Sequence, residues 1–247
     1  MPFQPPAASQ RRLAGVNFAA AVDFAAQAKQ RFDNKDNERG NRDPSRCKAL
    51  LKFPGADGPV FWSSKMAIDA DGPSAGPGRL SGSQLDPRYG QDRTSYTPFD
   101  RDGLPSETVP YIVLPRATPN SKIPFDAAVQ LGDVAVVIFN DEITDAICGD
   151  IGPYNKIGEA SIRVHEVLQC PDPCTKRDSQ GYCLSIGNAS VDEDVLYFVF
   201  PNSSFGEGEL TYDNINTKVS ERAYGLYDKF RAAAEMVAAG QAPPPQS

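Results

Sequence analysis

The sequence predicts a mainly β domain, either a sandwich or a barrel, with one helix at each end. From residue 59 to residue 200, short segments rich in Val, Ile, Tyr and Phe alternate with turns of Gly, Pro, Asn and Asp. The segments recur roughly every ten residues without helical periodicity between them, which disfavours a parallel sheet with crossover helices. Gly and Pro, at 20 and 22 of 247 residues, indicate many turns.

Seven segments have the composition of strands. The segment 132–140, GDVAVVIFN, is apolar on both faces and is typical of a buried central strand. In the segment 159–168, Ala160, Ile162 and Val164 share one face, so Glu159 is expected on the opposite, polar face. The predicted strands are 59–62, 66–69, 108–115, 132–140, 143–150, 159–168 and 194–200.

Two amphipathic helices are predicted by the spacing of apolar residues, over 17–32 and over 217–239. The Pro- and Gln-rich lead, 1–12, has no periodicity and is expected to be poorly ordered. These features divide the chain into an N-terminal lead and helix (1–46), a main domain that includes the C-terminal helix (47–240) and a disordered tail (241–247).

The charge and hydropathy of the chain bear on its partners. The net charge is −7, and no basic cluster of the kind that binds nucleic acid is present. No run of about 18 apolar residues predicts a membrane span, and the N-terminus has no apolar stretch of a signal peptide. We therefore expect a monomer without nucleic-acid or membrane partners, which either stays inside the cell or has lost a signal peptide.

Three of the five cysteines lie in one polar, Pro-rich segment. A disulfide between Cys183 and either Cys170 or Cys174 is expected in an oxidising compartment. Zinc is disfavoured, because His165 and these cysteines lack the paired C-x2-C spacing of structural zinc sites. Cys148 lies in an apolar run and is expected to be a buried free thiol.

Two acids stand out in the stretch GDIGPYNKIGEASIR, 149–163. Asp150 and Glu159 each follow a glycine, one at either end of the turn between two predicted strands. A tight hairpin would place the strand ends about 5 Å apart, and an open loop would place them further apart. Glycosidases need their two carboxyl groups about 5–5.5 Å apart for retention, or about 6.5–9.5 Å for inversion. The spacing suits a catalytic pair, and equally a solvated turn.

Other catalytic motifs are missing from the sequence. His165 is the single histidine, and no G-x-S-x-G elbow, Walker loop or G-x-G-x-x-G is present. The DADG at 69–72 lacks the acids of a calcium loop. We therefore expect no metal and no cofactor. The carboxylates, aromatics and polar turns suit a sugar cleft, in an enzyme or in a simple binding domain.

Six segments in order form a family pattern: KMAIDADGP (65–73), LDPRYGQDRTSY (85–96), VPYIVLP (109–115), GDVAVVIFN (132–140), GDIGPYNKIGEASIRVH (149–165) and DVLYFVF (194–200). In this order they resemble the fungal-type endo-chitosanases of glycoside hydrolase family 75. The GDIGP…IGEAS block is the most specific part. The neighbouring turn is also similar to a motif of double-psi β-barrels.

The resemblance implies a fold, a location and a catalytic pair. We expect a six-stranded double-psi-like β-barrel with flanking N- and C-terminal α-helices, in which 47–240 form the catalytic chitosanase domain. Family members are inverting and secreted, and their catalytic Asp and Glu map onto Asp150 and Glu159. The helical extensions, the cysteine-rich loop 170–183 and a DADG without the cysteine of many fungal members depart from the family.

Chitosan gives the acidic residues a chemical purpose. It is a β-1,4 polymer of glucosamine with amines protonated in mild acid, and without an N-acetyl group the sugar supplies no nucleophile of its own, so the protein must provide two carboxyls. We expect endo-acting hydrolysis with Glu159 as general acid, because it flanks an apolar strand, and Asp150 as general base.

Several other side chains are predicted to bind substrate. Asp69 and Asp71 suit the glucosamine amines, unless DADGP is only a turn. Tyr96 and Tyr111 are expected to stack on sugar rings, whereas Trp62 is expected in the core. The predicted substrate-binding residues are Asp69, Asp71, Asp86, Gln91, Tyr96 and Tyr111, with Asp92 behind them, while Lys65 and Arg163 either orient acidic partners or form surface ion pairs.

Two rival functions stay open. A non-catalytic expansin-like module would bind wall polysaccharide, chitosan included, without making new chain ends. A muramidase would cleave peptidoglycan, although an acidic protein gains little from its charge against an anionic wall.

Overall fold

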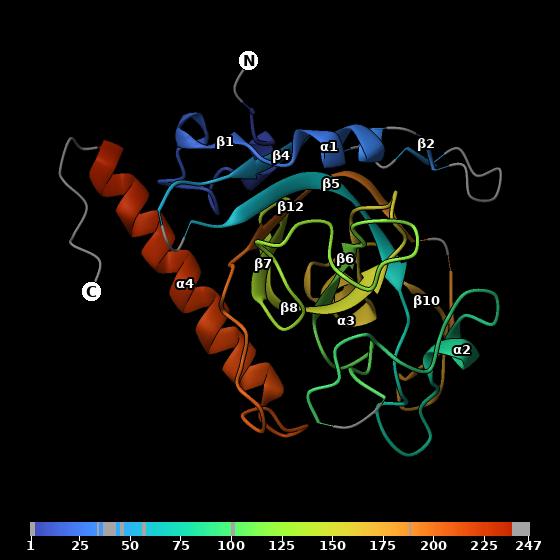
Figure 1. Ribbon diagram of the computed structural model, residues 1–247. Coiled ribbons are helices and arrows are strands. Elements are labelled where there is room, and N and C mark those ends of the chain that lie inside the picture. Colours follow the sequence, from blue (N-terminus) through green and yellow to red (C-terminus); the bar gives the residue numbers. More distant parts are fainter. Residues whose placement is uncertain are drawn as a thin grey trace.

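The computed structural model shows a β-barrel flanked by helices and long loops (Figure 1). The predicted tail, 241–247, lies outside the described residues, and the division of the chain at residues 46 and 240 stays a prediction. The structure describes residues 3–33, 35–36, 43–44, 47–55, 58–99, 102–187 and 189–238.

Six strands close into the barrel. Around the ring the order is β5, β12, β7, β8, β6 and β9, and β9 pairs back with β5. This confirms the predicted mainly β fold with a six-stranded barrel and flanking helices. The strands are β5 (Val60–Asp69), β6 (Tyr111–Pro115), β7 (Val134–Phe139), β8 (Glu142–Gly152), β9 (Glu159–Ser161) and β12 (Val191–Val199).

The strands on either side of the conspicuous acidic turn do not pair with each other. β6 lies between them, parallel to β8 and antiparallel to β9. Of the two geometries considered for residues 149–163, the tight hairpin is therefore excluded, and the open loop is the one observed. The predicted strand 159–168 is also too long, because the Ser161 side chain accepts a hydrogen bond from the Val164 amide and starts the helix α3 (Ile162–Val167).

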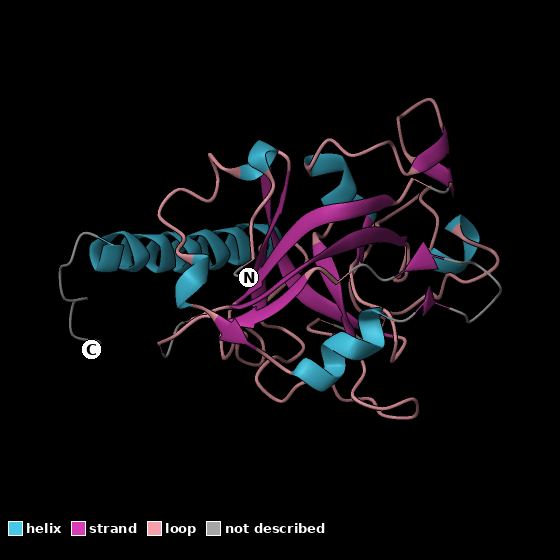
Figure 2. Cartoon of the chain, turned by 90° about the horizontal axis from the view of Figure 1, so that it is seen from above, coloured by secondary structure: helices cyan, strands magenta, loops and turns pink. Residues whose placement is uncertain are grey.

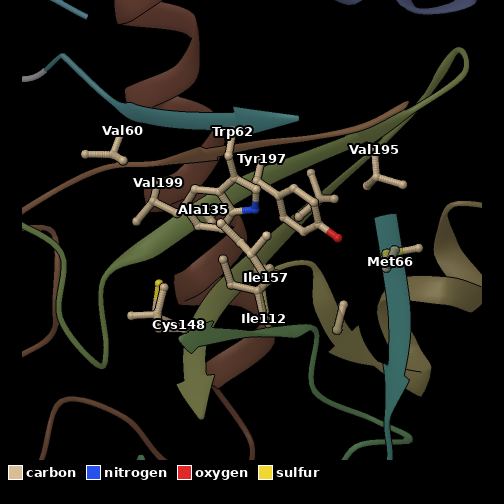
Figure 3. Close-up of a cluster of buried hydrophobic side chains, with 14 of the residues drawn as sticks. Val60, Trp62, Met66, Ile112, Ala135, Cys148, Ile157, Val195, Tyr197 and Val199 are labelled. Atoms are coloured by element: carbon tan, nitrogen blue, oxygen red, sulfur yellow. The ribbon is translucent and has the colours of Figure 1, made fainter. Parts of the chain in front are cut away.

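The barrel interior is filled by apolar side chains from all six strands and from the β8–β9 turn, and Figure 3 labels part of this cluster. Trp62 is fully buried and stacks on Tyr197, with ring centroids 5.2 Å apart, which confirms that Trp62 belongs to the core. Because successive side chains of a strand point to opposite faces, the intervening residues point outward from the barrel wall.

A second core lies outside the barrel, between its wall and the C-terminal helix α4 (Ile215–Ala238). The predicted helix 217–239 is confirmed with slightly shifted ends, and it packs against β7 and β8. Its buried side chains recur at helical spacing: Ile215, Val219, Ala223 and Tyr227. Figure 2 shows α4 extending beyond the strands on one side of the molecule.

The N-terminal segment packs onto this outer core. Phe3 contacts Phe18 and Phe61 with ring centroids 5.2 and 5.3 Å away, so the expectation of a poorly ordered lead is wrong for residues 3–12. The predicted helix 17–32 is right only for its second half. The elements are two 3-10 turns, η1 (Ala7–Ser9) and η2 (Phe18–Ala20), then β1 (Val22–Asp23) and α1 (Ala26–Asp33).

The remaining elements are short. β1 and β4 extend the sheet beyond β5, and two small two-stranded sheets lie apart from the barrel. These elements are β2 (Lys35–Asp36), β3 (Asp43–Pro44), β4 (Ala49–Lys52), α2 (Gly82–Leu85), β10 (Cys174–Arg177) and β11 (Cys183–Ile186).

The cysteines follow the sequence-based expectation. A disulfide joins Cys174 to Cys183, one of the two predicted pairings, and Cys170 is a free thiol. Cys148 is free and buried, as predicted. In the described part of the chain, no helix is both long and apolar enough to cross a membrane.

Candidate active site

Asp150 and Glu159 lie on the outer wall of the barrel. On β6, Val113 pairs with Asp150 of β8 on one side and with Glu159 of β9 on the other. Residues paired across neighbouring strands point to the same face of a sheet. Val113 belongs to the outer core, whereas its neighbour Ile112 belongs to the interior. Both carboxylates therefore point outward, on either side of Val113.

A β-bulge gives Asp150 its direction. Along β8, Cys148 pairs with Ile112, but Asp150 pairs with Val113, so Gly149 is an extra residue in this strand. Side chains alternate between the two faces, and a shift by one residue reverses them. Without the extra residue, Asp150 would share the interior face with Cys148.

Gly152 leaves room for the second carboxylate. A Cβ at position 152 would lie 2.8 Å from Oε2 of Glu159 and 2.8 Å from the Val113 side chain, closer than real side chains approach. The half-buried Glu159 carboxylate thus reaches from β9 across β6 to β8, onto the face that carries Asp150. The glycine at this position keeps the space between the two acids open.

Asp150 is nearly buried, with 6% of its surface exposed, and is oriented by hydrogen bonds. Its Oδ1 accepts hydrogen bonds from the Ser95 amide at 2.8 Å, the Ser95 hydroxyl, and the Ile151 amide at 2.7 Å. Burial raises the pKa of Asp150, while these hydrogen bonds and the positive charge of Arg116 oppose the rise.

Asp69 and Asp71 lie at the end of β5 and are tied to the same place. The Asp71 amide donates to Oδ1 of Asp69 at 2.7 Å. Gln91 donates to both carboxylate oxygens of Asp71, from its amide at 2.8 Å and from Nε2 at 2.9 Å. The Tyr111 hydroxyl donates to the Asp71 carbonyl at 2.7 Å. These contacts hold the DADGP stretch in place, and its binding of glucosamine stays a prediction.

The carboxylates affect one another's protonation. Burial raises the pKa of Asp69 well above its ordinary value, and the nearby charges of Asp71, Asp150 and Glu159 add to this. Burial likewise raises the pKa of Asp71 to about 7, against the hydrogen bonds from Gln91. A carboxyl group with a raised pKa keeps its proton to higher pH, unless a bound cation stabilises its ionised form.

One carboxylate oxygen each of Asp69, Asp71 and Asp150 lies within 4.8 Å of the others. Oxygens this close can hold a metal ion or surround an ammonium group. The absence of a metal in the working enzyme stays a prediction.

The other predicted substrate-binding residues have different positions. Oδ1 of Asp86 accepts hydrogen bonds from the amides of Arg88 and Tyr89, so this acid stabilises its own turn. Oδ1 of Asp92 accepts from the Ser83 amide at 3.0 Å. These contacts do not place Asp86 or Asp92 next to Asp69, Asp71 and Asp150. Their direct contact with substrate stays a prediction.

The two predicted stacking tyrosines differ. Tyr111 is fully buried, so the prediction that its ring stacks on a sugar is wrong; its hydroxyl holds the Asp69–Asp71 segment instead. The sequence pattern missed this because the long β5–β6 connection, 70–110, covers that face of β6. Tyr96 is half-buried with its ring against Gly132, and its role in stacking stays a prediction.

The structure adds residues that the sequence did not single out. Ser95 supplies two of the hydrogen bonds to Asp150, and Arg116 donates from Nε to the Gly152 carbonyl at 3.0 Å. Ser95 lies inside the family segment 85–96 but was not singled out there, and Arg116 lies just outside the segment 109–115, because the role of each depends on contacts between distant segments. Of the two cations considered earlier, Lys65 is buried on β5, and Arg163 pairs with Glu166 at 3.4 Å on the surface.

Glycoside hydrolases use a pair of carboxyl groups on either side of the bond that they cleave. The two carboxylates on this barrel wall, next to an acidic cluster, suit that chemistry. The sequence pattern of the fungal chitosanases of glycosyl hydrolase group 75 matches residues 66–223, and the chain belongs to this family. It is a glycoside hydrolase with a polysaccharide substrate. No curated protein matches the chain.

Proposed function

We propose that the protein is an inverting endo-chitosanase in which Asp150 and Glu159 form the catalytic pair. The observation that carries this proposal is the register of Val113, which pairs with Asp150 on one side and Glu159 on the other. Two strand spacings of about 4.8 Å separate the two backbones by about 10 Å. Inversion requires the two carboxyl groups to lie about 6.5–9.5 Å apart with a water molecule between them, and we propose this arrangement for the side chains of Asp150 and Glu159.

The hydrogen bonds support a division of roles. Ser95 and Ile151 donate to Oδ1 of Asp150 and stabilise its ionised form, which a general base needs. We assign the general acid to Glu159. It gives its proton to the glycosidic oxygen as the C1–O bond breaks. Asp150 takes a proton from the water that attacks C1 from the opposite ring face.

The acidic cluster supports chitosan as the substrate. The ammonium group of glucosamine can form charge-assisted hydrogen bonds with Asp69 and Asp71, whose carboxylates lie beside Asp150. A bound ammonium stabilises the ionised form of these acids, so binding is coupled to proton release from Asp71 at mildly acidic pH. Fungal chitosanases are typically extracellular, and we propose the same location for this protein.

The first test measures viscosity and new reducing ends on highly deacetylated chitosan, with chitin and peptidoglycan as comparison substrates. A rapid fall in viscosity on chitosan alone supports the endo-chitosanase. NMR of the first product anomers should give the configuration opposite to that of the β-linked substrate. Retention of the β configuration contradicts the proposed water-mediated step.

The second test replaces the proposed pair. Asp150→Asn and Glu159→Gln should each lower kcat about 10²–10⁴-fold, as expected for the loss of a general acid or base. Glu207→Gln, at an exposed loop position, is the matched control and should keep full activity. Near-normal rates in both folded site variants would refute the assignment. Binding without new chain ends would instead favour an expansin-like module, and cleavage of peptidoglycan alone would favour a muramidase.

A further inference from the structure

A pocket of about 470 Å³ borders Asp150 and has a charge opposite to that of the acidic cluster. Asp150 lines it, but Asp69, Asp71 and Glu159 do not. Three cations line it instead: Arg93, Arg116 and Lys122. The charge of the cleft thus changes sign at Asp150, from acidic on the Asp69–Asp71 side to basic on the pocket side.

The three cations of the pocket lie on the segments that precede and follow β6. Arg116 follows β6 directly and donates from Nε to the Gly152 carbonyl on β8, which orients its guanidinium group near Asp150. Arg93 comes from the β5–β6 connection and pairs with Asp102 at 3.2 Å at an exposed position. Lys122 lies on the exposed turn after β6. The three cations therefore come from two separate segments that meet around one pocket.

A polymer bound across Asp150 must place one sugar unit on each side. A protonated glucosamine is attracted by the acidic side, whereas Arg116 and Lys122 repel it in the pocket, and the charge of Arg93 is offset by Asp102. In chitosan, the only unit without an ammonium group is residual N-acetylglucosamine. Its amide carbonyl accepts hydrogen bonds, and guanidinium and ammonium groups supply only donors.

We infer that the pocket lined by Arg93, Arg116 and Lys122 binds an N-acetylglucosamine unit, while the Asp69–Asp71 side binds glucosamine. This inference rests on the proposed chitosanase function. The enzyme then cleaves partly acetylated chitosan preferentially at mixed linkages, and the basic residues determine which of the two new ends carries the acetyl group.

The test uses partly acetylated chitosan and NMR of the sugar units at both new chain ends. The native enzyme should give one end enriched in N-acetylglucosamine over the average of the polymer. Lys122→Glu reverses one charge of the pocket without touching the proposed catalytic pair. It should weaken the enrichment and raise the rate on fully deacetylated chitosan about threefold to tenfold, with a smaller effect at high salt.

Lys176→Glu is the matched control, since it makes the same charge change at an exposed position on β10. It should leave the end composition unchanged. Cleavage with both ends at the average composition of the polymer would overturn this inference but not the chitosanase. Equal behaviour of the two lysine variants would also overturn it. A complete lack of new ends on every chitosan would reject the proposed function, and this inference with it.

Discussion

At the scale of single residues, Asp71 shows how the site acts against stability. Burial raises its pKa to about 7 from an ordinary 3.8, despite the hydrogen bonds from Gln91. Between these two values the folded protein holds a proton that the unfolded chain has already released. The native state therefore loses stability as the pH rises through this window, and its stability relative to the unfolded chain is greatest below it.

Asp71→Asn removes this titration and should stabilise the protein most at high pH. The gain should be small at about pH 4 and should reach up to a few kcal/mol above about pH 7, since one pKa unit corresponds to about 1.4 kcal/mol. Thermal melts across this pH range measure it. The exposed Asp192→Asn serves as control and should show no such trend. A gain that does not grow with pH would mean that Asp71 is ionised in the folded state.

The sequence predicted which residues belong to the candidate site better than it predicted the surroundings of each side chain. The motif around Asp150 and Glu159 marked two acids that the structure places on one face, and the structure brings Asp69 and Asp71, two predicted substrate-binding residues, beside Asp150. Tyr111 was misjudged, since strand periodicity cannot show which loop covers an outward-facing side chain. The contribution of each side chain depends on contacts between distant segments, which no local pattern contains.

At the scale of elements, α1 contacts the turn between β8 and β9, the strands that carry the proposed catalytic pair. The guanidinium group of Arg31 on α1 lies 4.1 Å from the ring centroid of Tyr154, which lies two residues after the end of β8, in the β8–β9 turn. The same side chain donates from Nη1 to the Ala117 carbonyl at 3.0 Å. An N-terminal helix outside the family match at 66–223 thus contacts the segment that joins Asp150 to Glu159.

Loss of this contact should impair turnover more than binding. We expect Arg31→Gln to lower kcat about threefold to fivefold, in line with a cation–π contact of about 0.5–1 kcal/mol, with little change in KM. Arg31→Lys should restore part of the loss. Tyr154→Phe, which keeps the ring, should stay close to the native enzyme. An equal loss in the Tyr154→Phe variant, or a change in KM alone, would argue against a positioning role for α1.

The elements divide into those with strong local signals and those without. The strand 132–140 and the helix 217–239 were predicted closely, because a continuous apolar run and a helical stripe are local features. The position of β6 between β8 and β9 was not predicted, because it joins strands that are distant in sequence. The strand 159–168 was overextended, because the capping serine at 161 does not interrupt its apolar alternation.

At the scale of the whole molecule, charge governs the encounter with substrate. The chain has a net charge of −7, and a polymer of protonated glucosamine is a polycation. Fields of this kind speed association and are screened over about 10 Å at 0.1 M salt. The buried network around Asp150 is screened much less than the exposed surface. Salt should therefore separate the approach of the polymer from the chemical step.

We expect kcat/KM on glucosamine oligomers to fall steeply as sodium chloride is added, while kcat at saturating substrate changes little. Short oligomers avoid the change in coil size that salt causes in long chitosan. Circular dichroism at each salt concentration checks that the fold is unchanged. A parallel fall in kcat would show that salt acts on the proposed catalytic carboxylates themselves. A kcat/KM independent of salt would mean that the local contacts of Asp69 and Asp71, and not the overall charge, provide the attraction.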